Sequence, residues 1–257
     1  MYHVKPVFKY NNLTYHNPTY NNPMNNPIDK GSFKHATCLL TISVGQEVHE
    51  DEKFAATVQL VNASFASCIL LIDCSLQRHS IALDKTQDAD FFYEYSVLAG
   101  DLWLERNKKH YQNLSILKEI IRWDTWLQHP NYVEQKNKIL SLIAEDATYK
   151  ECFDRTIDEF LRRFYARLFE NDINRERTRS LCLDYLIEEC TALCLWTELG
   201  AHFEVYPAKR NEVMQETHKR FVQPLYPELV QAVSIKFKGR RQLKAQNFHS
   251  TETTTED

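Results

Sequence analysis

The sequence has 257 residues, of which 43% are hydrophobic, and a formal net charge of -4 at pH 7. This length suits one large domain with a substantial core. The negative charge argues against general binding of polyanions and excludes DNA as an expected partner, so contact with RNA would depend on local basic patches. No apolar run approaches the roughly 20 residues that cross a bilayer, and the N-terminus lacks the apolar stretch of a signal peptide. We therefore expect a soluble, cytoplasmic, monomeric protein.

Neither the cysteines nor the histidines follow the spacing of a metal site. The seven cysteines include no Cys-x-x-Cys pair, so we expect reduced side chains in the core. The ten histidines never occur at His-x-x-x-His spacing, and a chain with only five glycines has no glycine-rich phosphate loop. We expect no metal and no cofactor, because a cofactor-free reaction fits this pattern better than one dependent on ATP or NAD.

The first part of the chain predicts a short arm followed by a sheet. Residues 1–30 are rich in Asn, Tyr and Pro, which favour turns and extended chain, and we predict an N-terminal arm there. The apolar run 37–44 predicts a strand buried on both faces. An amphipathic helix over 50–65 and a second apolar strand over 67–73 follow. Strand, helix and strand in this order form a βαβ unit with a parallel sheet.

The rest of the chain is predicted to be mainly helical. The elements expected are a helix over 88–113, a strand over 119–123, helices over 133–170 and 175–199, and a strand over 201–207. We predict a single α/β domain over 31–244 and a disordered polar tail over 245–257. The basic segment 236–244 suits either a phosphate contact or a solvated tail, and the second is the commoner case.

Two groups of basic residues are candidates for contact with RNA. Cations gather near the end of the helix over 88–113, where they suit the helix dipole. Arginines in the helix over 133–170 lie largely off its apolar stripe, and a solvated basic face explains them equally well. The candidates are Arg106, Lys108, Lys109, Arg162, Arg163 and Arg167.

Four polar side chains are candidates for an active site. Ligands bind at the carboxyl ends of parallel strands, so Ser43 and Asp73 both point toward the expected crevice. A serine at a strand end is usually a turn residue, however, and Ser43 lacks the Gly-x-Ser-x-Gly elbow of hydrolases. Tyr185 and Glu189 share one face of a largely apolar helix, where a carboxylate needs a partner or a shifted pKa. The alternative is an ordinary glutamate on a helix surface.

These residues lie in four short motifs that resemble those of the tRNA-dependent cyclodipeptide synthases. The motifs, in the family's order across about residues 35–210, are TISVGQ (41–46), HPNY (129–132), DYLIEE (184–189) and VYP (205–207). The resemblance implies that Ser43 is the nucleophile and that Tyr206 assists the proton transfers. It also implies that Tyr185 and Glu189 hold the substrate amino group and that Tyr132 lines the active site.

Finer features of the resemblance concern the family branch and the substrate pocket. Gln46 and Pro207 resemble the branch called XYP, and we assign both to the substrate-binding set. Thr41 stands where members often have glycine, which would narrow or reshape the neighbouring pocket. Leu39, Thr41 and Leu70 are expected to line the pocket for the first aminoacyl group. The implied fold is a Rossmann-like parallel sheet flanked by helices, similar to the catalytic domain of class I aminoacyl-tRNA synthetases.

The implied reaction joins the aminoacyl groups of two aminoacyl-tRNAs. Ser43 would take the first group as an ester, a second amine would attack it, and ring closure would release a 2,5-diketopiperazine without ATP. Two other classes stay open. One is a non-catalytic tRNA-binding protein on a synthetase-like scaffold. The other is a serine acyltransferase or hydrolase that does not use tRNA, for which His49 or His79 would have to lie near the serine.

Overall fold

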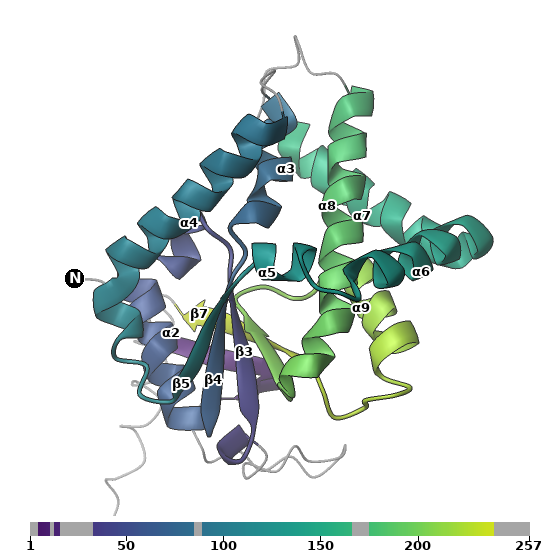
Figure 1. Cartoon of the computed structure of the whole chain (residues 1–257). Helices are drawn as coiled ribbons and strands as arrows, with labels where there is room; N and C mark the ends of the chain where they lie inside the picture. Colours follow the sequence, from purple (N-terminus) through teal and green to yellow (C-terminus); the bar gives the residue numbers. More distant parts are fainter. Residues whose placement is uncertain (1–4, 11–12, 16–32, 85–88, 166–174, 239–257) are drawn as a thin grey trace, which may run out of the picture.

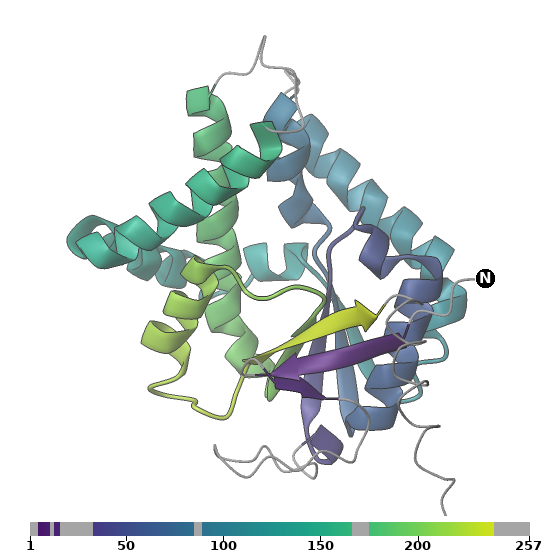
Figure 2. The ribbon, with the colours of Figure 1, turned by 180° about the vertical axis from the view of Figure 1, so that it is seen from behind.

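A seven-stranded sheet forms the centre of the computed structural model, which describes residues 5–10, 13–15, 33–84, 89–165 and 175–238 (Figures 1 and 2). The strands lie side by side in the order β2-β1-β7-β6-β3-β4-β5. Their bounds are β1 Lys5–Tyr10, β2 Leu13–Tyr15, β3 Thr37–Ile42, β4 Ser67–Ile72, β5 Leu117–Arg122, β6 Phe203–Tyr206 and β7 Gln231–Lys238.

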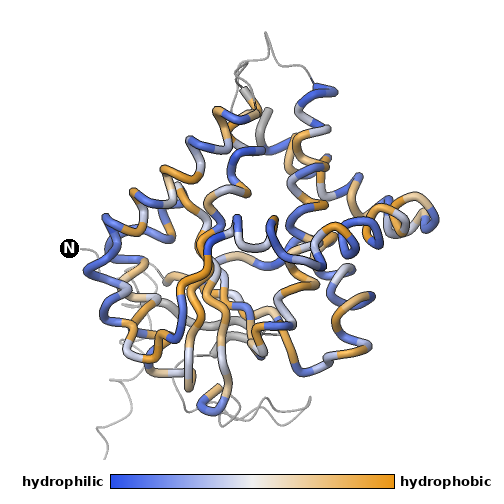
Figure 3. Tube along the Cα trace, in the orientation of Figure 1, coloured by the Kyte–Doolittle hydropathy of each residue, from blue (hydrophilic) through white to orange (hydrophobic). Residues whose placement is uncertain are grey.

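The five strands from β7 to β5 are parallel, which confirms the predicted parallel sheet. In β4 every residue is buried, and in β3 every residue but the first, as expected for continuous apolar strands with both faces covered. Figure 3 shows these strands as the most continuously hydrophobic part of the trace. Because β3 and β4 are paired in register from Thr37↔Ser67 to Ile42↔Ile72, the residues that follow them emerge next to each other.

The other edge of the sheet was not predicted. The backbone of β1 pairs antiparallel with β7, with Phe8 opposite Ile235, so part of the expected N-terminal arm is a sheet strand (Figure 2). The first three residues of the basic segment over 236–244, for which a phosphate contact and a solvated tail were both open, belong instead to β7, which extends to Lys238. Val233 and Ile235 of β7 are buried and alternate with more exposed residues, the pattern of a strand with one covered face. Residues 239–244 and the predicted tail lie outside the described residues.

The helices predicted over 50–65, 88–113 and 175–199 are present as α2, α4 and α8, whereas α3, α5 and α9 were not predicted. Their bounds are α2 Asp51–Ser64, α3 Arg78–Ile81, α4 Ala89–Tyr111, α5 Asp124–Leu127, α6 Tyr132–Glu145, α7 Ala147–Tyr165, α8 Arg175–Leu195 and α9 Glu212–Thr217, with short turns η1 Glu47–His49, η2 Ser75–Gln77, η3 Ala82–Asp84, η4 Trp196–Leu199 and η5 His218–Val222. The helix predicted over 133–170 is interrupted at Asp146, which has extended backbone angles between α6 and α7.

Two hydrophobic clusters fill the molecule. One surrounds the sheet, and the other lies among α6, α7 and α8, where Tyr149, Phe153 and Ile157 pack against Cys190. Helix α2 packs against α4, and α8 packs against α3, α6, α7 and α9. The seven cysteines are all unpaired, and six of them are buried. None of the described helices is long and apolar enough to cross a membrane.

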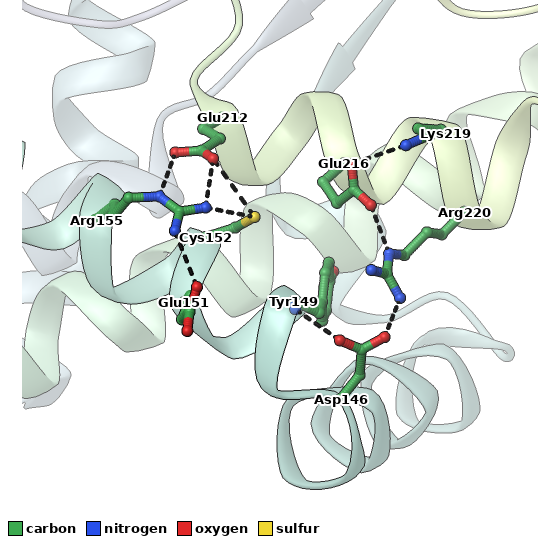
Figure 4. Close-up of polar contacts among 9 residues, drawn as sticks. All are labelled: Asp146, Tyr149, Glu151, Cys152, Arg155, Glu212, Glu216, Lys219 and Arg220. Atoms are coloured by element: carbon green, nitrogen blue, oxygen red, sulfur yellow. Dashed lines mark hydrogen bonds and ion pairs between the residues drawn. The ribbon is translucent and has the colours of Figure 1, made fainter.

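Ion pairs fix α9 and η5 against the start and middle of α7 (Figure 4). The guanidinium of Arg155 donates to Glu212 at 2.6 and 3.1 Å, and Arg220 pairs with Asp146 at 2.5 Å and with Glu216 at 2.7 Å. These contacts are half-exposed and contribute little stability individually. They do hold the first residues of α9 in one position beside the site described next.

Candidate active site

Ser43 lies in a tight turn immediately after β3. The carbonyl of Ser43 accepts a hydrogen bond from the Gln46 amide at 3.2 Å, and Gly45 within this turn has a φ of +87°. Such a left-handed angle favours glycine, which explains the Val-Gly-Gln sequence after the serine. The turn ends the strand abruptly, so the Ser43 hydroxyl is directed to the carboxyl edge of the sheet.

The Ser43 hydroxyl lies in a short chain of hydrogen bonds. It donates to Asp73 Oδ2 at 2.7 Å, and it is 2.9 Å from the hydroxyl of Tyr206 at the end of β6. Since the one serine proton points to Asp73, the Tyr206 hydroxyl is the donor to Ser43 Oγ. Burial raises the pKa of Tyr206, and the neighbouring Asp73 raises it further, so the phenol stays protonated.

His49 contacts the backbone of the Ser43 turn and not the serine hydroxyl. Its Nδ1 accepts a hydrogen bond from the Ser43 amide at 2.9 Å, which leaves Nε2 protonated in the neutral ring and without a partner among the described residues. Burial lowers the pKa of His49 to about 4, and its ring lies 5.5 Å from that of Tyr206. Because His79 instead contacts Glu188 at 3.4 Å, neither histidine occupies the place of a hydrolase base.

A cavity of about 230 Å³ lies between the Ser43 turn and helices α7 and α8. Its lining includes Ser43, Gln46, Tyr206 and Tyr185, together with polar and apolar side chains of α7 and α8. The remaining lining residues are Gln77, His79, Ser80, Leu83, Thr156, Ile157, Phe160, Arg163, Leu181, Cys182, Leu186 and Asn211. A mixed lining of this kind can hold a small group with one polar and one apolar part.

Glu189 lies behind the cavity wall beside Asn211. The Asn211 amide, which lines the cavity, donates to Glu189 Oε2 at 3.2 Å, and its own oxygen caps α9 by accepting from the Met214 amide at 2.8 Å. Burial raises the pKa of Glu189 to about 8, and the nearby Glu204 adds to the rise. Tyr185, one helical turn earlier, has a raised pKa because of burial and then of Glu189.

The adjacent Glu188 has a different environment, although the sequence pairs it with Glu189. Its carboxylate accepts hydrogen bonds from Arg78 at 2.9 Å and from the indole of Trp123 at 2.7 Å. Burial opposes ionisation, yet the hydrogen bonds from His79 and Arg78 outweigh it and lower the pKa of Glu188. Glu188 is therefore a buried, fully paired anion, whereas Glu189 has one amide donor.

Several residues expected to line the substrate pocket do not reach this cavity. Leu39 and Leu70 are fully buried inside the sheet, because helices cover both faces of β3 and β4 and only residues beyond the strand ends are accessible. The Thr41 hydroxyl is also buried, 3.4 Å from the Val205 carbonyl. Tyr132 is buried near Glu188, and Pro207 lies outside the lining. Of the residues assigned to substrate binding, Gln46 lines this cavity, and the assignment of the others stays a prediction.

The two basic groups differ in their surroundings. Arg106 pairs with Glu50 at 2.8 Å, and Lys109 lines a surface hollow together with four carboxylates, those of Glu47, Glu50, Asp51 and Glu52. Lys108 is exposed on the same helix. By contrast Arg162 is exposed on α7 and Arg163 lines the cavity, where its nearest carboxylate is Glu159 at 3.8 Å. Arg167 lies outside the described residues.

Comparison with known proteins places the chain in a family. No protein-family model and no curated protein matches it. Among solved structures, a CDPS (cyclodipeptide synthase) from Fluoribacter dumoffii shares 38% sequence identity, with a TM-score of 0.82, over 93% of this chain and 99% of that one. The chain belongs to the cyclodipeptide synthases. It is thus an aminoacyltransferase, and four motifs recognised in the sequence named the family correctly.

More distant cyclodipeptide synthases share the fold. One from Candidatus Glomeribacter gigasporarum, bound to Phe-tRNAPhe, has 16% identity and a TM-score of 0.64 over 80% of this chain and 89% of that one. A Mycobacterium tuberculosis protein, whose structure is described as relating cyclodipeptide synthetases to type I tRNA synthetases, has 10% identity and a TM-score of 0.58 over 79% and 86%. The predicted synthetase-like fold is confirmed.

Sequence reasoning missed several residues of the site. Asn211 carries the signal of a helix N-cap, but its contact with Glu189 joins positions 22 residues apart that no local pattern relates. Gln77, which donates to Asp73, lies in a short turn whose placement depends on the tertiary fold. Among the described residues, no group of three His, Cys, Asp or Glu side chains is arranged to hold a metal ion.

Proposed function

We propose that the chain joins two aminoacyl groups, each delivered by a tRNA, into a cyclic dipeptide through esters on Ser43. The main support is one observation: a buried serine hydroxyl, hydrogen-bonded to Asp73 and Tyr206, faces a cavity in a member of this family. The related synthase bound to Phe-tRNAPhe supports aminoacyl-tRNA as the substrate class. The serine hydroxyl donates its hydrogen bond to Asp73, and no histidine among the described residues contacts this hydroxyl. This arrangement disfavours a hydrolase of the Ser-His type.

The reaction would proceed by four acyl transfers. Ser43 Oγ attacks the ester carbonyl of the first aminoacyl-tRNA, which forms a seryl ester and releases the tRNA hydroxyl. The amine of the second aminoacyl-tRNA then attacks the seryl ester and frees the serine. The dipeptidyl-tRNA so formed passes its dipeptidyl group back to Ser43, which releases the hydroxyl of the second tRNA. Finally the free amine of the dipeptide attacks the seryl ester, which closes the ring and restores the hydroxyl. Tyr206 would supply hydrogen bonds to the oxygen atoms that exchange protons.

Tyr185 and Glu189 would hold the substrate amino group. Tyr185 lines the cavity beside Ser43, and Glu189 lies behind Asn211, close enough to raise the pKa of both Tyr185 and Asp73. An arriving ammonium group would add a positive charge at this buried carboxyl group, since the nearby Arg210 is already paired with Glu204. We also assign the chain to the XYP branch, because Gln46 stands three residues after Ser43 and Pro207 follows Tyr206.

Expression in a bacterial host tests the proposed function directly. An active synthase would draw on the charged tRNAs of the host, so mass spectrometry of the culture medium should detect a cyclic dipeptide that a vector control lacks. The same spectrum identifies the two amino acids. Binding of tRNA without any cyclic dipeptide in the medium, and without label on protein treated with total aminoacyl-tRNA, would favour the non-catalytic alternative.

We further infer that the arginines of α7 contact the tRNA more than the cations of α4 do. The double change Arg162→Glu with Arg163→Glu should weaken tRNA binding at least about tenfold at 0.1 M salt, and flatten the dependence of log Kd on log salt by about 0.7 to 0.9 per lost phosphate contact. The matched change Lys108→Glu with Lys109→Glu should do less, because four of the seven residues that line the hollow at Lys109 are acidic. Equal effects of both pairs in a salt titration would contradict this ranking.

A further inference from the structure

The steps proposed above leave Asp73 without a role, although it holds the nucleophile. We propose that Asp73 is the general base that takes the proton of Ser43 when the serine is acylated. This inference rests on the proposed function, because it describes the first acyl transfer. It follows from how the sheet positions the carboxylate, from the contacts of its two oxygens, and from the lack of another base at the hydroxyl.

The sheet itself places the two side chains together. Strands β3 and β4 are parallel neighbours with Ile42 opposite Ile72, so the next residue of each strand, Ser43 and Asp73, emerges at the same level. The Asp73 amide donates to the Ile42 carbonyl at 3.0 Å, which continues the ladder to the last residue before the serine. A base fixed in this way needs no rearrangement before it acts.

The two oxygens of Asp73 have separate partners. Oδ1 accepts from the Val44 amide at 3.0 Å and so anchors the turn, while Oδ2 accepts from Ser43 Oγ at 2.7 Å and from Gln77 Nε2 at 3.3 Å. The side chain is nearly inaccessible, with 7% of its surface exposed. One oxygen is therefore structural and the other faces the nucleophile, within the distance that proton transfer requires.

No other described group is placed to accept this proton. Tyr206, the second partner of Ser43 Oγ, is a protonated donor, and His49 accepts from the backbone amide of Ser43 instead of its hydroxyl. Burial raises the pKa of Asp73 well above its usual range, and Glu189 adds to this rise, while hydrogen bonds from Ser43 and Val44 partly oppose it. A raised pKa makes the ionised carboxylate a stronger base toward the serine, and it lowers the fraction of Asp73 that is ionised near neutral pH, so the rate of acylation should rise with pH.

The proton balance closes within the first transfer. As the bond from Ser43 Oγ to the carbonyl carbon forms, the serine proton moves to Asp73 Oδ2. As the bond to the ribose oxygen of the departing tRNA breaks, that oxygen takes up the proton, and Asp73 returns to its ionised form. The acyl-enzyme and a neutral tRNA hydroxyl are the products, and no other reactant is needed.

The test is the rate of acyl-enzyme formation as a function of pH, measured in single turnovers with one radiolabelled aminoacyl-tRNA. Asp73→Asn keeps an oxygen for the Val44 amide but cannot accept a proton. It should acylate about 10²- to 10⁴-fold more slowly than the wild type and should lose the rise in rate with increasing pH. The titratable groups facing Asp73 are Tyr206 of β6 and Tyr185 and Glu189 of α8. Glu189 is the one carboxyl group among these three. If Asp73 causes the rise in acylation rate with pH, that rise should persist in Glu189→Gln.

Two outcomes would overturn the role of Asp73: acylation by Asp73→Asn within threefold of the wild-type rate, or a slower rate with an unchanged pH profile, as a purely structural residue would give. Should melting curves show that Asp73→Asn does not fold, Asp73→Ser, whose hydroxyl can accept from Val44, is held to the same criteria. Absence of acid-stable label on the wild-type enzyme would instead contradict the proposed function. If the wild type is labelled and Asp73→Asn is acylated at the wild-type rate, only the role of Asp73 as the base is contradicted, and the proposed function is not.

Discussion

Replacing Ser43 by alanine should abolish both the acid-stable label from aminoacyl-tRNA and the cyclic dipeptide, with a loss of at least about 10³-fold in product formation. In the proposed reaction this hydroxyl carries each ester, and alanine has no group that could replace it. The fold should persist, since the change removes one oxygen and two hydrogen bonds, to Asp73 and from Tyr206, each worth about 1 kcal/mol. Single-turnover labelling and thermal melting measure the two effects on the same protein.

Ser75→Ala is the matched control for this prediction. Ser75 is also fully buried and lies two residues beyond Asp73, but its hydroxyl has no hydrogen-bond partner among the described residues and does not line the cavity. It should label at the wild-type rate. Label retained by Ser43→Ala at the level of Ser75→Ala would show that the ester forms elsewhere.

The parallel core of the sheet could be predicted because its strands are continuous apolar runs. A strand covered on both faces consists mostly of apolar residues, so the strands over 37–44 and 67–73 can be identified from their own sequence alone. The antiparallel edge could not be predicted in this way. The strand β7 alternates buried and exposed residues and ends in lysines, and β1 lies in a segment rich in Asn and Pro, so each depends on the other for its pairing.

The positions of Ser43 and Asp73 could be predicted from the strands that precede them, whereas the residues of the cavity wall could not. Ser43 and Asp73 end two neighbouring parallel strands, whose carboxyl ends meet at one edge of the sheet. The cavity wall instead comes from α7, α8 and η3, because the side chains within β3 and β4 are covered by helices. Pairs such as Glu188 with Arg78, 110 residues apart, become visible only when the tertiary fold brings the helices together.

Glu189→Gln should cripple acylation while making the protein more stable at alkaline pH. Glu189 has a folded pKa of about 8, raised from 4.5 by burial and by Glu204. A raised pKa means that the folded state binds the proton more tightly, so this stabilisation is complete below about pH 4.5 and is lost as pH rises through about 8. Glutamine does not titrate, and at pH 9 the variant should exceed the wild type by on the order of 2 kcal/mol or more.

The activity of the same variant should fall for a different reason. If the substrate ammonium group pairs with Glu189, loss of the charge removes a charge-assisted hydrogen bond worth about 1.5 to 3 kcal/mol, or about 10- to 100-fold in kcat/KM for acylation. Tyr185→Phe should have a smaller effect, because it deletes a hydroxyl and no charge. Labelling kinetics at pH 7 measure this loss, and urea unfolding at pH 6 and pH 9 measures the stability.

The neighbouring Glu188→Gln makes the comparison decisive, since it is the same chemical change one residue away. Glu188 is buried and pairs with Arg78, and its lowered pKa shows that the folded state favours the charged form. Neutralising it leaves a partly buried guanidinium without its counterion, which should cost about 3 kcal/mol of stability, while each folded molecule stays nearly as active. A loss of stability at pH 9 together with normal labelling for Glu189→Gln would give Glu189 the structural role that we assign to Glu188. Higher stability and slow labelling of Glu189→Gln would instead show that Glu189 binds the substrate. A buried carboxyl group that lowers the stability of the free protein then contributes through its interaction with the bound ligand.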